Sequence, residues 1–187
     1  MHDLQPLTAL GGATARSDIV GVVTLTERPD IALASVTARR GHEKACRAHL
    51  TDVIGAVPGP GNVQLHDSEA GFWMGPDSWM IGAPFASHED LADQLACRFG
   101  ATASITEQTD AWVCFDLQGA AMEDVMELLC AIDIRAMQTG DGTRTSIDHL
   151  GCFVLRRDPA DLVRILGPRS AAGSLHHALL TAMHAVA

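Results

Sequence analysis

Residues 77–84 read DSWMIGAP, and residues 161–168 read DLVRILGP, 84 positions further along the chain. Asp, Ile and Pro occupy the same places in both stretches. A polar segment follows each Pro, and leucines at helical spacing come next at the same offset: Leu91, Leu95, Leu175 and Leu179. A segment that recurs together with its neighbours is typical of a duplicated structural unit. We therefore expect a chain built from two related halves.

Hydrophobic periodicity predicts the order strand–helix–strand–strand–helix in both halves. In the first half we expect strands at 31–37, 71–74, 78–81 and 103–106, and helices at 42–54 and from the N-cap Ser87 to about 98. In the second half we expect strands at 112–117, 152–156 and 162–166, a loop at 139–145, and helices at 120–130 and from Ser170 or Ser174 to about 185. This pattern predicts an α+β fold of two pseudo-repeated strand–helix–strand–strand–helix halves, with helices packed on mostly antiparallel sheets.

The N-terminal residues stand outside this repeat. Residues 1–29 carry no amphipathic helix and offer one short strand at most, at 19–23. We expect them to form an N-terminal arm, a kind of segment that becomes ordered on another subunit. Residues 30–187 then form a single α+β domain made of two halves, about 30–107 and 108–187.

Charge and hydropathy exclude several classes of protein. The net charge is −10, with 13 basic and 23 acidic residues, and such a surface repels nucleic-acid backbones. No stretch approaches the ~20 apolar residues of a membrane span, and we expect no export signal at the N-terminus. Five cysteines without a CxxC pair indicate free thiols in a reducing cytoplasm.

Histidines and a cysteine on the helices are candidate metal ligands. His42, Cys46 and His49 share one face of the helix at 42–54. Zinc requires three or four close ligands, whereas Cys46 also belongs to the apolar stripe of that helix. We interpret Cys46 as a core residue. The last helix carries three histidines, which we interpret as surface or interface residues: His176, His177 and His184. We therefore predict no metal site.

Nucleotide binding and nucleophilic catalysis find little support in the motifs. The glycines at 59–61 do not open a helix, as a dinucleotide fingerprint requires. Ser174 lacks the GxSxG context, and we interpret Cys152, near His149, as a buried thiol. Acids that would act in general acid–base catalysis only if they line a pocket are Asp110, Asp116 and Asp148. We predict no catalytic and no cofactor-binding residue.

Arginine and tryptophan side chains are the candidate interface residues. Arg is favoured where carboxylates are bound and at protein interfaces, and Trp is a frequent interface anchor. Solvation of the arginines at strand ends and core packing of the tryptophans are the alternative interpretations. The candidates are Arg39, Arg40, Trp73, Trp79 and Arg169.

Four segments of the chain resemble the gamma subunit of heterotetrameric sarcosine oxidase. They are LTERPDIAL at 25–33, ARRG at 38–41, GPDSW at 75–79 and GPRS at 167–170. The resemblance lies in their order and spacing and runs from about Leu25 to the C-terminus. It implies a fold similar to the folate-binding part of the glycine-cleavage T-protein, which is itself built from repeated α+β units.

The resemblance implies a non-catalytic role in a larger assembly. Its alpha and beta subunits would carry FAD, FMN, NAD and the tetrahydrofolate site, and a delta subunit would carry zinc, so this chain would bind no cofactor itself. Such a complex demethylates sarcosine to glycine, with hydrogen peroxide and formaldehyde or methylenetetrahydrofolate as further products. The gamma subunit would serve as a structural and docking element.

Two other functions stay open. One is a stand-alone binding module for a folate-like or other small anionic ligand, held between the halves. The other is a small enzyme whose site is not evident from motifs. Co-purification with the larger subunits, a ligand-induced rise in melting temperature, and turnover by the lone chain separate the three hypotheses.

Overall fold

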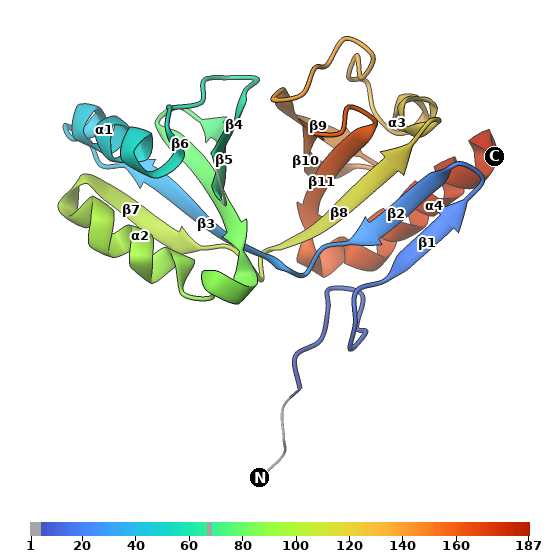
Figure 1. Cartoon of the computed structure of the whole chain (residues 1–187), viewed down its shortest axis with the longest axis horizontal. Helices are drawn as coiled ribbons and strands as arrows, with labels where there is room; N and C mark the ends of the chain where they lie inside the picture. Colours follow the sequence, from blue (N-terminus) through green and yellow to red (C-terminus); the bar gives the residue numbers. More distant parts are fainter. Residues whose placement is uncertain (1–4, 67–68) are drawn as a thin grey trace. The chain divides into compact units, whose positions relative to one another are not determined.

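The structure, a computed structural model, describes residues 5–66 and 69–187. In these residues four α-helices accompany two antiparallel sheets, and the chain divides into two compact units (Figure 1). Each sheet is covered by helices on one face. This is the α+β architecture that the sequence predicts.

Unit 2 comprises residues 30–110 and 140–143. Its sheet has the strand order β4-β5-β6-β3-β7, and α1 and α2 pack on one face of it. The elements are β3 (Ile31–Ala38), α1 (Glu43–Ile54), β4 (Val63–His66), β5 (Glu69–Gly75), β6 (Ser78–Pro84), the 3-10 turn η1 (Phe85–Ser87), α2 (Leu91–Phe99), the 3-10 turn η2 (Gly100–Thr102) and β7 (Ala103–Glu107). Alternate strand residues such as Val36 and Ile81 point at the helices and meet Leu50 and Leu95, which forms the core of this unit.

Unit 1 comprises residues 5–29, 111–139 and 144–187. Its sheet has the order β1-β2-β8-β11-β10-β9, with α3 and α4 against one face. The elements are β1 (Ser17–Val20), β2 (Val23–Glu27), β8 (Trp112–Gly119), α3 (Met122–Leu129), β9 (Gly142–Ile147), β10 (Leu150–Arg157), β11 (Leu162–Pro168), the 3-10 turn η3 (Arg169–Ala171) and α4 (Ala172–Val186). Leu25, Phe115, Ile165 and Leu179 are central residues of its core.

The repeated stretch occupies equivalent places in the two units. β6 and β11 begin and end at the offset of 84, and each leads through Pro into a 3-10 turn and then a helix. Both strands pair antiparallel with the first strand of their half, β3 in one unit and β8 in the other. The strand order β4-β5-β6-β3-β7 therefore corresponds to β9-β10-β11-β8-β2.

That correspondence reveals an exchange of strands between the halves. β2 precedes β3 in sequence but pairs with β8, while β7 precedes β8 but pairs with β3. The registers match as well, because Glu27 lies opposite Phe115 and Glu107 lies opposite Ala34. Each repeat is thus strand–strand–helix–three strands–helix, and each contributes its first strand to the sheet of the other.

The predicted N-terminal arm is wrong for residues 17–27. They form β1 and β2, and Val23 and Leu25 are each only 1% exposed in the core of unit 1. The alternation of Val23, Leu25 and Glu27 with threonines is a half-buried strand pattern. One partner of β2 is the neighbouring β1, but the partner that joins it to the rest of the sheet, β8, lies about 90 residues further on.

Local signals misplaced three further features. The expected loop at 139–145 contains most of β9, an edge strand whose polar residues alternate outward. Ser87 and Ser170 lie in the 3-10 turns and Ser174 lies inside α4, and none of them caps a helix. The 3-10 turn after each Pro delays the start of the helix, so the residues before α2 and α4 are Asp90 and Ala171.

Candidate functional site

Three arginines surround one aspartate on the face of the unit 1 sheet that lies away from the helices. Asp116 on β8 is the register partner of Arg164 on β11 and of Thr26 on β2. Arg28 follows Thr26 by two residues, and Arg157 on β10 follows Leu155, the partner of Arg164, by two residues. Because side chains alternate along strands, the four charged groups share a face, and we call them the arginine cluster.

Asp116 is bound by two of these arginines. Arg164 donates from Nε to Oδ1 at 2.7 Å and from Nη2 to Oδ2 at 2.8 Å, and Arg28 donates from Nη1 to Oδ2. The side chains of Asp116 and Arg164 are 8% and 14% exposed. A bidentate pair at this depth holds both groups in a defined orientation.

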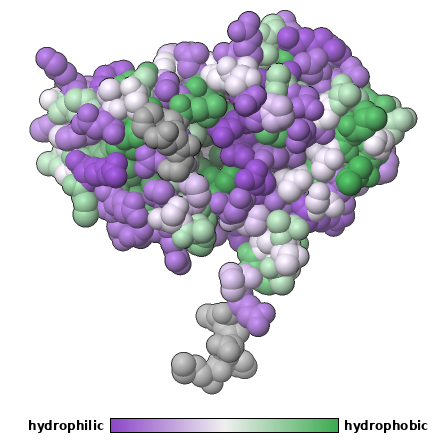
Figure 2. Space-filling view, in the orientation of Figure 1, coloured by the Kyte–Doolittle hydropathy of each residue, from purple (hydrophilic) through white to green (hydrophobic). Residues whose placement is uncertain are grey.

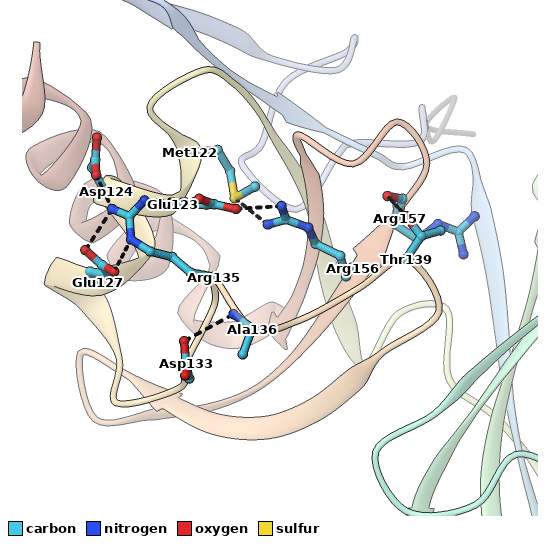
Figure 3. A network of polar contacts seen from close by, with 10 residues as sticks. All are labelled: Met122, Glu123, Asp124, Glu127, Asp133, Arg135, Ala136, Thr139, Arg156 and Arg157. Carbon is cyan, nitrogen blue, oxygen red and sulfur yellow. Dashed lines mark hydrogen bonds and ion pairs between the residues drawn. The ribbon is translucent and has the colours of Figure 1, made fainter.

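Arg157 brings a further positive charge that the cluster does not neutralise. Among the described residues its guanidinium group has no hydrogen-bond or ion-pair partner, and its side chain is half-buried. Figure 3 shows it pointing away from the network that surrounds Arg156. Burial lowers the pKa of Arg157, and the charge of Arg164 lowers it further. Asp116 thus faces three guanidinium groups and is bound directly by two of them, Arg28 and Arg164.

On the helix side of unit 1, a second network joins Arg156 and Arg135 to acids of α3, while the buried Nε of Arg156 has no hydrogen-bond partner among the described residues. Arg156 donates from Nη2 to Glu123 at 2.7 Å, and Arg135 binds Glu123, Asp124 and Glu127 of α3 (Figure 3). The Arg135 side chain is 50% exposed, so these pairs each contribute little to stability. They fix the loop after α3 against the first turns of that helix.

The N-terminal residues of unit 1 are held by buried polar groups. Glu27, 2% exposed, accepts hydrogen bonds from the backbone N–H of Leu10 at 3.0 Å and of Arg16 at 3.2 Å. The pair formed by Asp18 Oδ2 and His176 Nε2, at 2.8 Å, ties β1 to α4. Arg16 and then His176 lower the pKa of Asp18 through hydrogen bonds to its carboxylate.

The predicted interface residues are divided between the two units, four in unit 2 and Arg169 in unit 1. Arg39 and Arg40 are exposed after β3, and Arg39 donates to Ser104 at 3.3 Å. Trp73 is half-buried, whereas Trp79 is 1% exposed and donates from Nε1 to the carbonyl of Pro58 at 2.9 Å, inside the core. Arg169, in unit 1, donates to the carbonyl of Leu7 at 3.0 Å. Burial leaves Trp79 as a packing residue.

The candidate metal ligands and nucleophiles are dispersed. In the described part of the chain, three or more His, Cys, Asp or Glu side chains nowhere gather as a metal site requires. Cys46 is fully buried, and His49 packs against Phe99 with ring centroids 5.5 Å apart. Burial raises the pKa of Cys46 and of Cys152 to about 11, so both thiols stay protonated and weakly nucleophilic near neutral pH.

The candidate carboxylates also lie apart. Asp116 belongs to the arginine cluster, while Asp148 lies in a turn with φ of 46°. Asp148 lines an open groove of about 440 Å³ beside α3 and α4, together with Leu128, Leu129, His177, Thr181 and three alanines of α4. The groove is mostly apolar and brings together one imidazole, one carboxylate and the hydroxyl of Thr181, which donates to the carbonyl of His177 at 2.9 Å.

Sequence reasoning missed the arginine cluster as a unit. Arg28 lies within a segment quoted for the resemblance, and Asp116 was weighed only as a general acid or base. The available signal was a charged residue among apolar neighbours on predicted strands, as at Arg164 between Val163 and Ile165. Long charged side chains are seldom buried without a partner, so a charged residue at such a position indicates a buried ion pair.

Comparison with solved structures places this fold beside two proteins. Over 89% of this chain and 87% of the other, it is similar to a chain of heterotetrameric sarcosine oxidase from Corynebacterium sp. U-96 in complex with pyrrole 2-carboxylate, with a TM-score of 0.74 and 23% identity. Over 86% of this chain and 46% of the other, it is similar to the glycine cleavage system aminomethyltransferase T from Bartonella henselae, with a TM-score of 0.62 and 16% identity. The predicted resemblance is confirmed at the level of the fold.

The similarity to solved structures has no counterpart at the level of sequence. No protein-family model and no curated protein sequence matches the chain. None of the helices in residues 5–66 and 69–187 is both long and apolar enough to cross a membrane.

Proposed function

We propose that this protein is the gamma subunit of a cytoplasmic heterotetrameric sarcosine oxidase and acts there as a non-catalytic docking element. The observation that carries the proposal is the fold match, which extends over nearly the full length of both chains. The alpha, beta and delta subunits would be its partners and would hold FAD, FMN, NAD, tetrahydrofolate and zinc.

The segments behind the resemblance have structural roles in this chain, which supports a non-catalytic part. Glu27 binds backbone amides, and Arg28 binds Asp116. Arg47 donates to Asp77 at 2.6 Å and lies over the ring of Trp79, 5.1 Å from its centroid. These contacts stabilise turns and strand ends.

An exposed apolar hairpin supports the docking role. Ile19 and Val22 are 74% and 65% exposed at the edge strand β1 and the turn that follows it, and Leu7 is 58% exposed in the same unit. Figure 2 shows hydrophobic residues gathered at the end of the β1–β2 hairpin. An exposed apolar patch beside an unpaired strand edge is a typical protein–protein contact.

Co-expression tests the docking role directly. The chain is produced with the alpha, beta and delta subunits of the same source, and the complex is isolated through a tag on the alpha subunit. We expect co-elution in a 1:1 ratio and no turnover of sarcosine by the lone chain. Turnover by the lone chain, or its absence from the isolated complex, would contradict the proposal.

Charge substitutions locate the contact. Ile19→Glu combined with Val22→Glu should lower co-elution at least about tenfold, because two acids replace apolar contact area. Leu128→Glu, at a side chain that is 60% exposed on α3, is the matched control and should leave co-elution unchanged. The predicted interface residues are tested in the same way with Arg39→Glu and Arg40→Glu, against Arg98→Glu on α2.

A further inference from the structure

We propose that the arginine cluster of unit 1 is a binding site for a small oxyanion, a carboxylate or a phosphate, with Arg157 as its principal ligand and Arg164 and Arg28 as supporting charges. The site is distinct from the docking hairpin and does not depend on the proposed docking role. It lies on the face of the sheet opposite α3 and α4.

The sheet positions these arginines before any ligand arrives. Arg157 and Arg164 project from the neighbouring strands β10 and β11, and Arg28 follows β2 on the far side of β8. Arg164 is fixed by its two hydrogen bonds to Asp116, and Arg28 is fixed on Asp116 from the other side. Preorganised donors of this kind lose little conformational entropy when an anion binds.

The charge balance favours an added anion. An Arg side chain does not give up its proton under physiological conditions, so a half-buried guanidinium that lacks a carboxylate stays charged and poorly solvated. Arg157 is in this position, and burial together with the nearby Arg164 lowers its pKa. The ordinary answer of proteins to such a charge is an anionic partner.

The cluster already binds one carboxylate, that of its own Asp116. Asp116 receives the parallel Nε and Nη2 donors of Arg164, which is the bidentate geometry that carboxylates and phosphates share. Arg157 presents the same fork, and no described residue occupies it. A second oxyanion beside Asp116 would give the Arg157 guanidinium group an opposite charge to pair with.

Binding to the full chain tests the proposal. Isothermal titration in a low-salt buffer without oxyanions is carried out with inorganic phosphate and, separately, with succinate. Arg157→Gln removes the charge and the fork, Arg157→Lys keeps the charge alone, and Arg98→Gln removes an exposed charge from unit 2. We expect the wild type and Arg98→Gln to bind at least one probe equally, and Arg157→Gln to bind it at least about tenfold more weakly. Arg157→Lys should lie between them.

A stability measurement separates ligand binding from a structural role. Without anion, Arg157→Gln should have a denaturation midpoint equal to or above that of the wild type, because an uncompensated charge is removed. With saturating phosphate or succinate the order should reverse, since only the wild type is stabilised by binding.

Either probe supports the proposal and identifies which oxyanion the site prefers. The site is refuted if neither probe binds below about 10 mM, or if the affinity is unchanged in Arg157→Gln. A lower stability of Arg157→Gln in the absence of anion would show that Arg157 serves the fold and would equally overturn the proposal.

Discussion

Glu27 stands at the end of β2, where its two carboxylate oxygens accept backbone hydrogen bonds from residues 10 and 16. Glu107 is its register equivalent on β7, yet that side chain is exposed and, within residues 5–66 and 69–187, accepts a hydrogen bond only from the nearby N–H of Thr109, at 2.6 Å. The same residue type at the same place in the repeat thus makes different contacts in the two units. In unit 1 it satisfies amides of a loop that unit 2 does not have.

Glu27→Ala should therefore destabilise the protein by about 2–4 kcal/mol, because two hydrogen bonds to a buried charged acceptor are lost. Glu107→Ala serves as the matched control and should change the free energy of unfolding by about 1 kcal/mol or less. Urea denaturation followed by circular dichroism measures both. Equal effects of the two substitutions would show that the loop does not depend on Glu27.

Thiol chemistry is also set residue by residue. Cys97 is exposed on α2, whereas Cys46 and Cys152 are buried with pKa values near 11. We expect a maleimide reagent at pH 7 to label Cys97 rapidly in the native protein and the two buried thiols only after unfolding. Mass spectrometry reads the sites, and Cys97→Ser should remove the rapid phase. Rapid native labelling of Cys46 or Cys152 would contradict their burial.

The same thiols predict a loss of stability in alkali. Their pKa is raised in the folded state, so the unfolded chain releases their protons first as the pH rises above about 9. Their contribution is fully retained below that pH and is lost progressively up to about pH 11. Replacing both by Ala removes this titration, so the slope of unfolding free energy against pH between 9 and 11 should become shallower. An unchanged slope would show that other groups control alkaline unfolding.

At the scale of elements, the junction of β8 and β2 admits no side chain. Gly119 at the end of β8 has a φ of 134°, and a Cβ there would lie 2.0 Å from the carbonyl oxygen of Val22. A backbone oxygen at this distance can move only if the β1–β2 hairpin moves. The hairpin that carries the proposed docking patch is thus positioned by a glycine in another half of the chain.

Gly119→Ala should cost roughly 3 kcal/mol or more and loosen β2 from the sheet. Gly173→Ala, in the first turn of α4 with open space around it, should instead be neutral or stabilise the protein by up to about 1 kcal/mol. Thermal unfolding gives the stabilities, and amide hydrogen exchange in β2 reports the pairing. Unchanged protection of β2 in Gly119→Ala would refute this account.

Periodicity located the helix-facing strands and all four helices, because burial against a helix leaves an alternating or 3.6-residue pattern. It failed for β2, β4 and β9. The partner that joins β2 to the rest of its sheet, β8, lies far away in sequence. β4 is an edge strand of four residues, and β9 is a polar edge strand whose pattern resembles that of a loop. The arginine cluster was not predicted for the same reason, since its members come from β8, β10, β11 and the turn after β2.

For the whole molecule, the exchange of β2 and β7 decides which parts can fold alone. Residues 30–110 contain all five strands of the unit 2 sheet, with both of its helices. Residues 111–187 lack β1 and β2, so β8 would be left with an unpaired edge and a gap in its core where Val23 and Leu25 pack.

We therefore expect the fragment 30–110 to unfold cooperatively by itself, although it loses the pairing of Asn62 with Asp141. The fragment 111–187 should stay unfolded or aggregate until a peptide of residues 5–29 is added, when native circular dichroism and cooperative melting should appear. The peptide with Leu25→Asp is the control and should not restore folding. A fragment 111–187 that folds without the peptide would show that β2 is dispensable, as a free arm would be.

Local pattern alone specifies the duplicated α+β plan, since the equivalence of residues 77–84 and 161–168 is written in residue types that fold into the same strand, turn and helix start. Composition also specifies an acidic protein, with a net charge of −10. Only the folded chain shows which sheet contains the first strand of each repeat, and which arginine of the arginine cluster remains without a carboxylate. Both depend on contacts between residues as much as about 90 positions apart, and such pairings leave no periodic trace in the sequence.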